Sequence, residues 1–275
     1  MTQNPSPPLV GAAMNIRSFA AYRGWIIEQQ RDLEIQDFMD APALDGDWRS
    51  IADNIKRQLD GYRGRLGIHG PFWGFAIDSQ DPLVRAVVTK RLLQALAACE
   101  AIGATQMVIH SPFTTWDYNN LDLYPRSRLA LTERVHATLE DVVARAESIG
   151  CELVIENIED KDPMARVQLA RSFNSNAVRV SLDTGHAQYA HVSTGAPPVD
   201  YYVNAANDML AHVHIHDNDG YADRHWVPGE GTVRWQAVFR ALGALSVRPR
   251  LVIEVRDSTR IRQGVDHLEA LGLVT

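Results

Sequence analysis

The sequence predicts an α/β protein whose chain forms a closed (β/α)8 barrel as a single domain over residues 1–275. The length of 275 residues is close to the roughly 250 that such a barrel typically needs. Short runs rich in β-branched residues alternate along the chain with longer segments whose apolar residues have helical spacing. The short runs are apolar on both faces, as the strands of a buried parallel sheet are. The competing arrangement, an open doubly wound sheet, would more often carry a glycine-rich phosphate loop after its first strand, and the sequence has none there.

Each element of this barrel has its own local signal. The predicted strands are 9–14, 33–38, 65–69, 106–110, 152–156, 178–183, 212–216 and 250–255. The predicted helices are 18–30, 48–62, 82–102, 125–149, 163–173, 200–210, 233–242 and 260–271. Gly103 and Gly150 stop the two long helices, because glycine readily takes the left-handed conformation of a helix end. Residues 1–8 are rich in proline and are predicted to be a disordered lead-in.

The composition excludes several classes of protein. Hydrophobic residues make up 45% of the chain, which is enough for a large core. The formal net charge is −7, so no broad basic field is available for nucleic acid or anionic membranes. No apolar run reaches the roughly 18 residues that span a bilayer, and the N-terminus lacks the pattern of a secretory signal. Cys99 and Cys151 are predicted to be buried thiols of a reducing compartment. We therefore expect a cytoplasmic protein.

Histidines and carboxylates stand at the ends of successive predicted strands. In a barrel these ends meet on one face. The residues at or just after them are His69, His110, Glu156, Asp183, His216 and Glu254. Loop residues add His186, Asp223 and His225. Clustered carboxylates repel one another unless cations lie between them, and this mixture of nitrogen and oxygen ligands suits zinc, manganese or cobalt. The pattern predicts a divalent metal site.

Simpler interpretations apply to several of these side chains one at a time. A single histidine at a strand end is more often a buried hydrogen-bonded group than a ligand, and it is the repetition from strand to strand that favours metal. His212 and His214 lie on the same strand face as His216 but deeper, so we expect core hydrogen bonds for them. Phe72, Trp73 and Trp116 would form either an apolar wall for a substrate or a lid over the core. Arg224 lies inside the ligand loop, and we consider it a candidate substrate contact.

Five short motifs resemble the xylose-isomerase-like TIM barrel superfamily, which includes endonuclease IV and the ketose 3-epimerases. They are IEN at 155–157, DTGH at 183–186, HDND at 216–219, DRHWVPGEG at 223–231 and IEV at 253–255. By this resemblance Glu156, Asp183, His216 and Glu254 would hold one metal. His69 and His110, with Glu156 bridging, match the second metal of endonuclease IV. His186, Asp223 and His225 match its third, so one to three ions of manganese or zinc are expected.

The resemblance implies two functions of different classes. The first is isomerisation or epimerisation of a sugar or sugar phosphate, in which Glu156 and Glu254 would move a proton on opposite faces of the substrate and His186 would bind a hydroxyl. The second is hydrolysis of a phosphodiester at an abasic DNA site by a trinuclear centre.

We favour the sugar because acidic residues follow the second strand, where they would repel a duplex: Asp37, Asp40, Asp45 and Asp47. A small-molecule sugar is therefore the expected partner, nucleic acid and membranes are not, and a homo-oligomer remains open.

Overall fold

The computed structural model describes residues 7–275, and its strands close in chain order, β1 to β8, into one parallel barrel. The strands are β1 (Gly11–Met14), β2 (Leu33–Ile35), β3 (Leu66–His69), β4 (Gln106–His110), β5 (Glu152–Glu156), β6 (Val178–Asp183), β7 (Leu210–Ile215) and β8 (Arg250–Ile253). Because β1 pairs in parallel with both β2 and β8, the described sheet has no free edge. The closed barrel is the predicted fold, and the open sheet is excluded.

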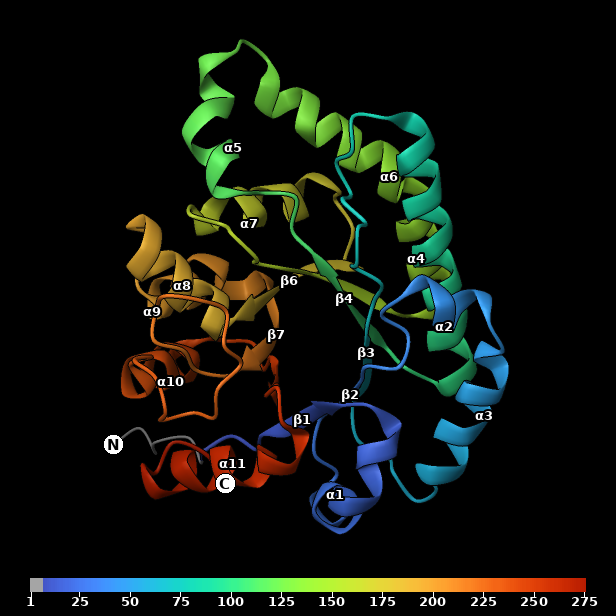
Figure 1. Cartoon of the computed structure of the whole chain (residues 1–275), viewed down its shortest axis with the longest axis vertical. Helices are drawn as coiled ribbons and strands as arrows, with labels where there is room; N and C mark the ends of the chain where they lie inside the picture. The colour runs from blue at the N-terminus through green and yellow to red at the C-terminus, as the bar shows by residue number, and fades with distance from the viewer. Residues whose placement is uncertain (1–6) are drawn as a thin grey trace.

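Helices surround the strands as a ring, which Figure 1 shows with the barrel in the middle. The longer helices are α1 (Ile16–Gln29), α3 (Trp48–Gln58), α4 (Pro82–Ile102), α6 (Ser127–Ile149), α7 (Pro163–Ser172), α8 (Thr184–Thr194), α9 (Val199–Ala206), α10 (Trp235–Ala244) and α11 (Ile261–Ala270). The short ones are α2 (Ala41–Asp45), α5 (Thr115–Asn120), η1 (Leu121–Leu123), η2 (Asn207–Met209) and η3 (Ser258–Arg260). The first and last of the longer helices, α1 and α11, are neighbours in this ring (Figure 1).

Local sequence signals explain where the long helices begin and end. Asp81 caps α4 by accepting the Leu83 N–H at 2.8 Å, Pro82 follows at the first helical position, and Gly103 ends the helix with φ 74°. Gly150 ends α6 in the same way with φ 65°. These ends agree with the predicted ones, since only glycine takes a positive φ without steric cost.

The core has an apolar layer between strands and helices and a polar lumen inside the barrel. Side chains such as Phe19, Ile26 and Leu92 are buried between the helices and the sheet. The barrel strands also contribute buried polar side chains, which form a cluster inside the barrel: Glu34, His212 and His214. A polar lumen places ionisable groups directly beneath the carboxyl ends of the strands.

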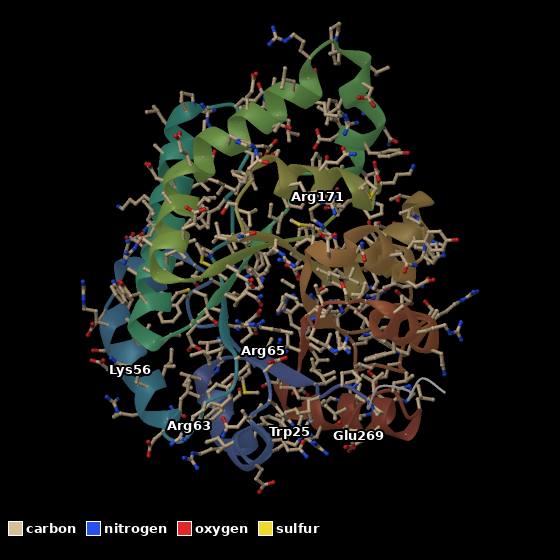
Figure 2. The ribbon with its side chains drawn as sticks, turned by 180° about the vertical axis from the view of Figure 1, so that it is seen from behind. Trp25, Lys56, Arg63, Arg65, Arg171 and Glu269 are labelled. Atoms are coloured by element: carbon tan, nitrogen blue, oxygen red, sulfur yellow. The ribbon has the colours of Figure 1, made fainter. Side chains whose placement is uncertain are left out.

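The amino ends of the strands are held together by an ion pair. Arg65 donates to both oxygens of Asp32 at 2.7 and 2.6 Å and to the Arg248 carbonyl at 2.9 Å. Figure 2, seen from behind, shows Arg65 near the middle of the barrel and shows Trp25 of α1 and Glu269 of α11 at the same edge. Arg262 of α11 lies over the Trp25 ring at 4.9 Å. Structural contacts therefore stabilise this end of the barrel.

Some predicted boundaries were wrong. Helices α2, α5 and α8 fall in segments that we expected to be loops, and β2 ends at Ile35 rather than residue 38. Of the predicted lead-in, residues 1–6 lie outside the described residues. Pro8 does not fit that prediction, because its carbonyl accepts the Thr275 N–H at 3.0 Å. Among residues 7–275 no helix is long and apolar enough to cross a membrane, and Cys99 and Cys151 are buried free thiols.

Candidate metal centre

The carboxyl ends of the strands bring all the predicted ligands to one end of the barrel. His69, His110, Glu156 and Asp183 are the last residues of β3, β4, β5 and β6. The register places His110 beside Glu156, and Asp183 beside His214 of β7. The side chains fall into overlapping groups whose ligand atoms lie within 4.8 Å of one another.

The first group, which we call the His69 group, consists of His69, His110 and Glu156. Nε2 of His69 lies 3.7 Å and Nε2 of His110 lies 3.5 Å from Oε2 of Glu156. Nδ1 of His69 is 2.8 Å from the Gly70 carbonyl, an acceptor only, so this nitrogen carries the hydrogen. In the neutral ring, Nε2 then has the lone pair that a metal ligand requires.

The second group, which we call the central group, consists of Glu156, Asp183, His214 and Glu254. Nδ1 of His214 contacts Oε1 of Glu156 and lies 3.4 Å from Glu254 and 3.9 Å from Asp183. We predicted His216 in this place, but the structure groups His214 with these carboxylates, because β7 pairs His214 with Asp183 in register and sets His216 just beyond the end of the strand. The core hydrogen bonds that we expected for His214 are also present, since its Nε2 lies 3.1 Å from Glu34.

The third group, which we call the His186 group, consists of His186, His216, Asp223 and His225. Oδ2 of Asp223 lies 3.5 Å from Nε2 of His186 and 3.2 Å from Nε2 of His225. The rings of His216 and His225 stack with centroids 3.9 Å apart. His216 also links this group to the central one, since its Nε2 lies 2.8 Å from Oδ2 of Asp183.

Charge in these groups is balanced between histidines and carboxylates. Burial alone would raise the pKa of Asp183, but the charges of His186 and His216 outweigh it and lower that pKa to about 2. Burial would lower the pKa of His225, yet its hydrogen bond with Asp223 and the charge of Glu254 raise it to about 9. A metal ion must displace such protons, so its binding should strengthen as the pH rises.

The residues of these groups fit a divalent cation. Imidazole nitrogens and carboxylate oxygens are the ligands that zinc and manganese use, and their spacing allows several to reach one ion. Nδ1 of His216 is buried and has no hydrogen-bond partner among the described residues. A buried ring nitrogen without a partner is costly, so this histidine is not satisfied by hydrogen bonds alone.

Residues that the sequence analysis did not single out hold the ligands in place. The amide of Asn157 donates to the Asp183 carbonyl at 3.0 Å and accepts the Asp183 N–H at 2.9 Å, while buried Arg166 donates to the same amide at 2.7 Å. Asp217 accepts from the Gly229 and Val233 N–H groups at 2.9 and 3.0 Å, which shapes the loop of Asp223 and His225. Both Asn157 and Asp217 stand inside the IEN and HDND motifs, next to predicted ligands.

The predicted substrate contacts are only partly brought to this site. Phe72 stacks on His110 with ring centroids 4.4 Å apart, and Trp73 packs on Phe72 at 4.7 Å with 67% of its surface exposed. Trp116 lies on α5 and lines a separate pocket of about 480 Å³ that contains none of the ligands. Arg224 pairs with Asp219 at 3.3 Å and lies over Tyr221 and Trp226.

The acidic residues after β2 have structural partners. Asp40 and Asp47 accept backbone N–H groups at the starts of α2 and α3, at 2.9 and 3.2 Å. Asp37 accepts the Ile16 N–H at 2.7 Å, and Asp45 pairs with Arg91. These contacts fix the positions of the four side chains, and of the four only Asp45 pairs with a cation among the described residues.

Histidines and carboxylates gather at the carboxyl ends of the strands of this parallel barrel. The arrangement places the chain in the class of barrels that carry a candidate metal centre at that end. Within that class, the model of the xylose isomerase-like TIM barrel family matches residues 27–271, and the chain belongs to this family.

Similar proteins span a range of distances. The TTHB071 protein from Thermus thermophilus, whose crystal was soaked with ZnCl2, is 26% identical over 95% of this chain and 97% of its own, with a TM-score of 0.74. The 3-keto-D-glucoside 4-epimerase from E. coli is 18% identical over 96% and 99%, with a TM-score of 0.71, which shows a shared fold. A fructoselysine 3-epimerase from Escherichia coli O157:H7 is 30% identical over 114 residues, 39% of each chain.

Proposed function

We propose that this chain is a divalent-metal-dependent isomerase or epimerase of a sugar or sugar phosphate, with manganese or zinc as its ion. The observation that carries the proposal is the central group. Its carboxylates Glu156 and Glu254 come from β5 and from the residue after β8, so they reach the group from different sides of the barrel. Similarity to named epimerases supports the same reaction class.

A divalent ion held by Glu156, Asp183, His214 and Glu254 would polarise a sugar carbonyl and the adjacent hydroxyl. Glu156 and Glu254 would then remove and return a proton on opposite faces of the substrate. Gln36 donates to Oε1 of Glu254 at 2.6 Å, which fixes the orientation of that carboxylate. Two carboxylates held this way suit a reaction that inverts one carbon centre.

Side chains around the groups would bind the rest of the sugar. His186 would donate a hydrogen bond to a hydroxyl, and Phe72 with Trp73 would cover the apolar side of the ring. Arg224 would need to leave Asp219 to reach a substrate, and Trp116 would need to move with α5. We therefore assign recognition to Phe72 and Trp73 before Trp116 and Arg224.

Solvent exchange is the test of this reaction. The manganese- or zinc-loaded protein is incubated in D2O with a panel of ketoses and ketose phosphates, and the products are followed by NMR. We expect deuterium to enter the carbon next to the carbonyl as the epimer or aldose appears. A loaded protein that exchanges no carbon-bound hydrogen in any of these sugars would contradict the proposal.

A second candidate function is hydrolysis of a phosphodiester at an abasic DNA site. It is favoured by one observation, that the His69, central and His186 groups adjoin through Glu156 and through the contact of Asp183 with His216. Three ions in these groups would bind a phosphate and activate a bridging water. An abasic oligonucleotide assay separates the two functions. If Asp223→Ala loses one metal ion per chain and also loses cleavage of the oligonucleotide, hydrolysis is favoured. If that variant still exchanges the carbon-bound hydrogen of the sugar like wild type, the epimerase is favoured.

A further inference from the structure

Beneath the central group, a carboxylate lies buried among histidines. Glu34 of β2 is only 2% exposed, and its carboxylate oxygens are both 3.1 Å from Nε2 of His214. Oε2 of Glu34 also lies 3.3 Å from Nε2 of His212. The opposite nitrogen of His212 lies 2.9 Å from Oγ of Ser181. The ring of His214 is thus held between Glu34 below it and the carboxylates of the central group above it.

This contact determines which nitrogen of His214 keeps its hydrogen when a metal binds. An ionised carboxylate is only an acceptor, so the Nε2 atom that faces Glu34 must carry the hydrogen. Nδ1 points at Glu156, Asp183 and Glu254 and donates to Glu156 until a metal ion displaces its hydrogen, while the hydrogen on Nε2 stays with Glu34. A carboxylate that accepts from the outer nitrogen of a ligating histidine fixes its ring and raises its basicity.

Glu34 has no other partner that explains its burial. Among residues 7–275 its ion pairs are those with His212 and His214, and no arginine or lysine lies within 4.0 Å of it in that part of the chain. An ionised carboxylate in such a place is costly unless it is paired and hydrogen-bonded. Its surroundings therefore connect it to the ligand His214.

We propose that Glu34 is a positioning residue that holds His214 with Nε2–H towards the barrel lumen and Nδ1 towards the central group. The inference rests on the proposed function, because it assigns Glu34 a role in preparing that centre for its ion. Glu34 itself does not touch the reacting atoms. Its effect is exerted through the orientation and basicity of one ligand.

Metal affinity in a matched pair of variants tests this role. In Glu34→Gln the shape is kept and the charge is lost, while Glu152→Gln makes the same change at the start of β5, where Glu152 accepts from Gln106 at 3.0 Å. Zinc affinity is measured by competition with a chromogenic chelator, and folding by circular dichroism. We expect Glu34→Gln to bind zinc about 10- to 100-fold more weakly than wild type and Glu152→Gln to bind like wild type. Equal affinities in all three folded proteins would overturn the proposal.

A second readout decides the role of Glu34 even if the wild type binds no metal. In protein labelled with 15N-histidine, the Nε2–H signal of His214 is assigned by its loss in His214→Gln. We expect this proton to exchange slowly in wild type and in Glu152→Gln, and to exchange rapidly or vanish in Glu34→Gln and Glu34→Ala. Absence of zinc binding in wild type would refute the proposed centre alone, whereas a signal that is independent of residue 34 would refute the positioning role. Complete loss of one ion from Glu34→Gln, with the others held normally, would make Glu34 a ligand of its own ion and would equally refute it.

Discussion

Glu156 is the side chain on which two of the ligand groups depend. Its Oε2 faces His69 and His110, and its Oε1 faces His214. It is 1% exposed, and although burial would raise its pKa, the charge of His214 and hydrogen bonds from His214 and His69 hold that pKa well below its usual value. A carboxylate kept ionised at this position can serve as both a ligand and a proton acceptor.

Glu156→Gln tests this double role. The amide keeps the volume but neither accepts a proton nor offers a charged ligand oxygen, so we expect isomerase activity to fall by about 10²- to 10⁴-fold. Thermal melting followed by circular dichroism should remain cooperative. Glu152→Gln, which removes a carboxylate from the other end of the same strand, serves as the control and should keep its activity. A Glu156→Gln protein that turns over sugar like wild type would show that this carboxylate has neither role.

The sequence predicted which strand-end histidines and carboxylates gather at one end of the barrel, but it did not predict their grouping or the place of His214 among them. Strand-end histidines and carboxylates are visible in the sequence because each closes an apolar run. His212, His214 and His216 share one face of β7, however, and only the register with β6 determines their depth. That register shifts between Val180 and Ser181, an irregularity without a sequence signal. Glu34 escaped notice because a single carboxylate in a three-residue strand has no pattern of its own.

At the scale of elements, the start of α8 builds part of the site. Asp183 caps this helix, since its Oδ1 accepts the His186 N–H at 2.7 Å while its Oδ2 faces His216. We expected a loop at 184–186. The cap explains why a helix nevertheless begins there. It also places His186 one turn from Asp183.

Gly185→Ala tests the close packing at this helix start. A Cβ on Gly185 would lie 2.0 Å from Cε1 of His216, so the ring must move. We expect a loss of about 1–3 kcal/mol in the free energy of unfolding together with weaker zinc binding in the His186 group. Gly243→Ala in α10 is the matched control, because nothing lies within 4 Å of its added Cβ, and it should gain up to about 1 kcal/mol. Similar behaviour of both variants in urea unfolding and zinc titration would show that the His216 ring is not held by α8.

The segment after β5 contains a carboxyl group that should make stability depend on pH. Burial raises the pKa of Asp160 from its usual value near 3.8 to about 6, against the opposing charge of Arg166. Because the folded state binds this proton more tightly than the unfolded state, the stabilisation is complete below pH 3.8 and is lost as the pH rises through about 6.

Asp160→Asn isolates this contribution, since an amide does not titrate in this range. We predict that the free energy of unfolding of wild type, relative to Asp160→Asn, falls by up to about 3 kcal/mol between pH 4 and pH 7. Urea unfolding at several pH values measures the difference, in which titrations shared by both proteins cancel. A difference that stays constant across this interval would show that Asp160 titrates normally.

At the scale of the whole molecule, the alternation of strands and helices was enough to predict the closed barrel. Parallel strands with buried faces and short connections leave few other arrangements. The surface was less predictable, because the roles of Asp37, Asp40, Asp45 and Asp47 depend on helix starts and on Arg91, which only the folded chain brings near. The placement of Trp116 on α5, apart from the ligands, likewise depends on a connection whose path has no regular sequence pattern.

The central claim is that the carboxyl end of this barrel holds divalent metal, and the metal content of the purified chain tests it most directly. The protein is loaded with zinc or manganese, desalted, and measured by mass spectrometry for metal per chain. The account predicts at least one tightly held ion per chain, with one ion indicating the central group alone and two or three indicating that the His69 and His186 groups are also occupied. A folded chain that emerges without metal, at a pH where the histidines can be deprotonated, would contradict it.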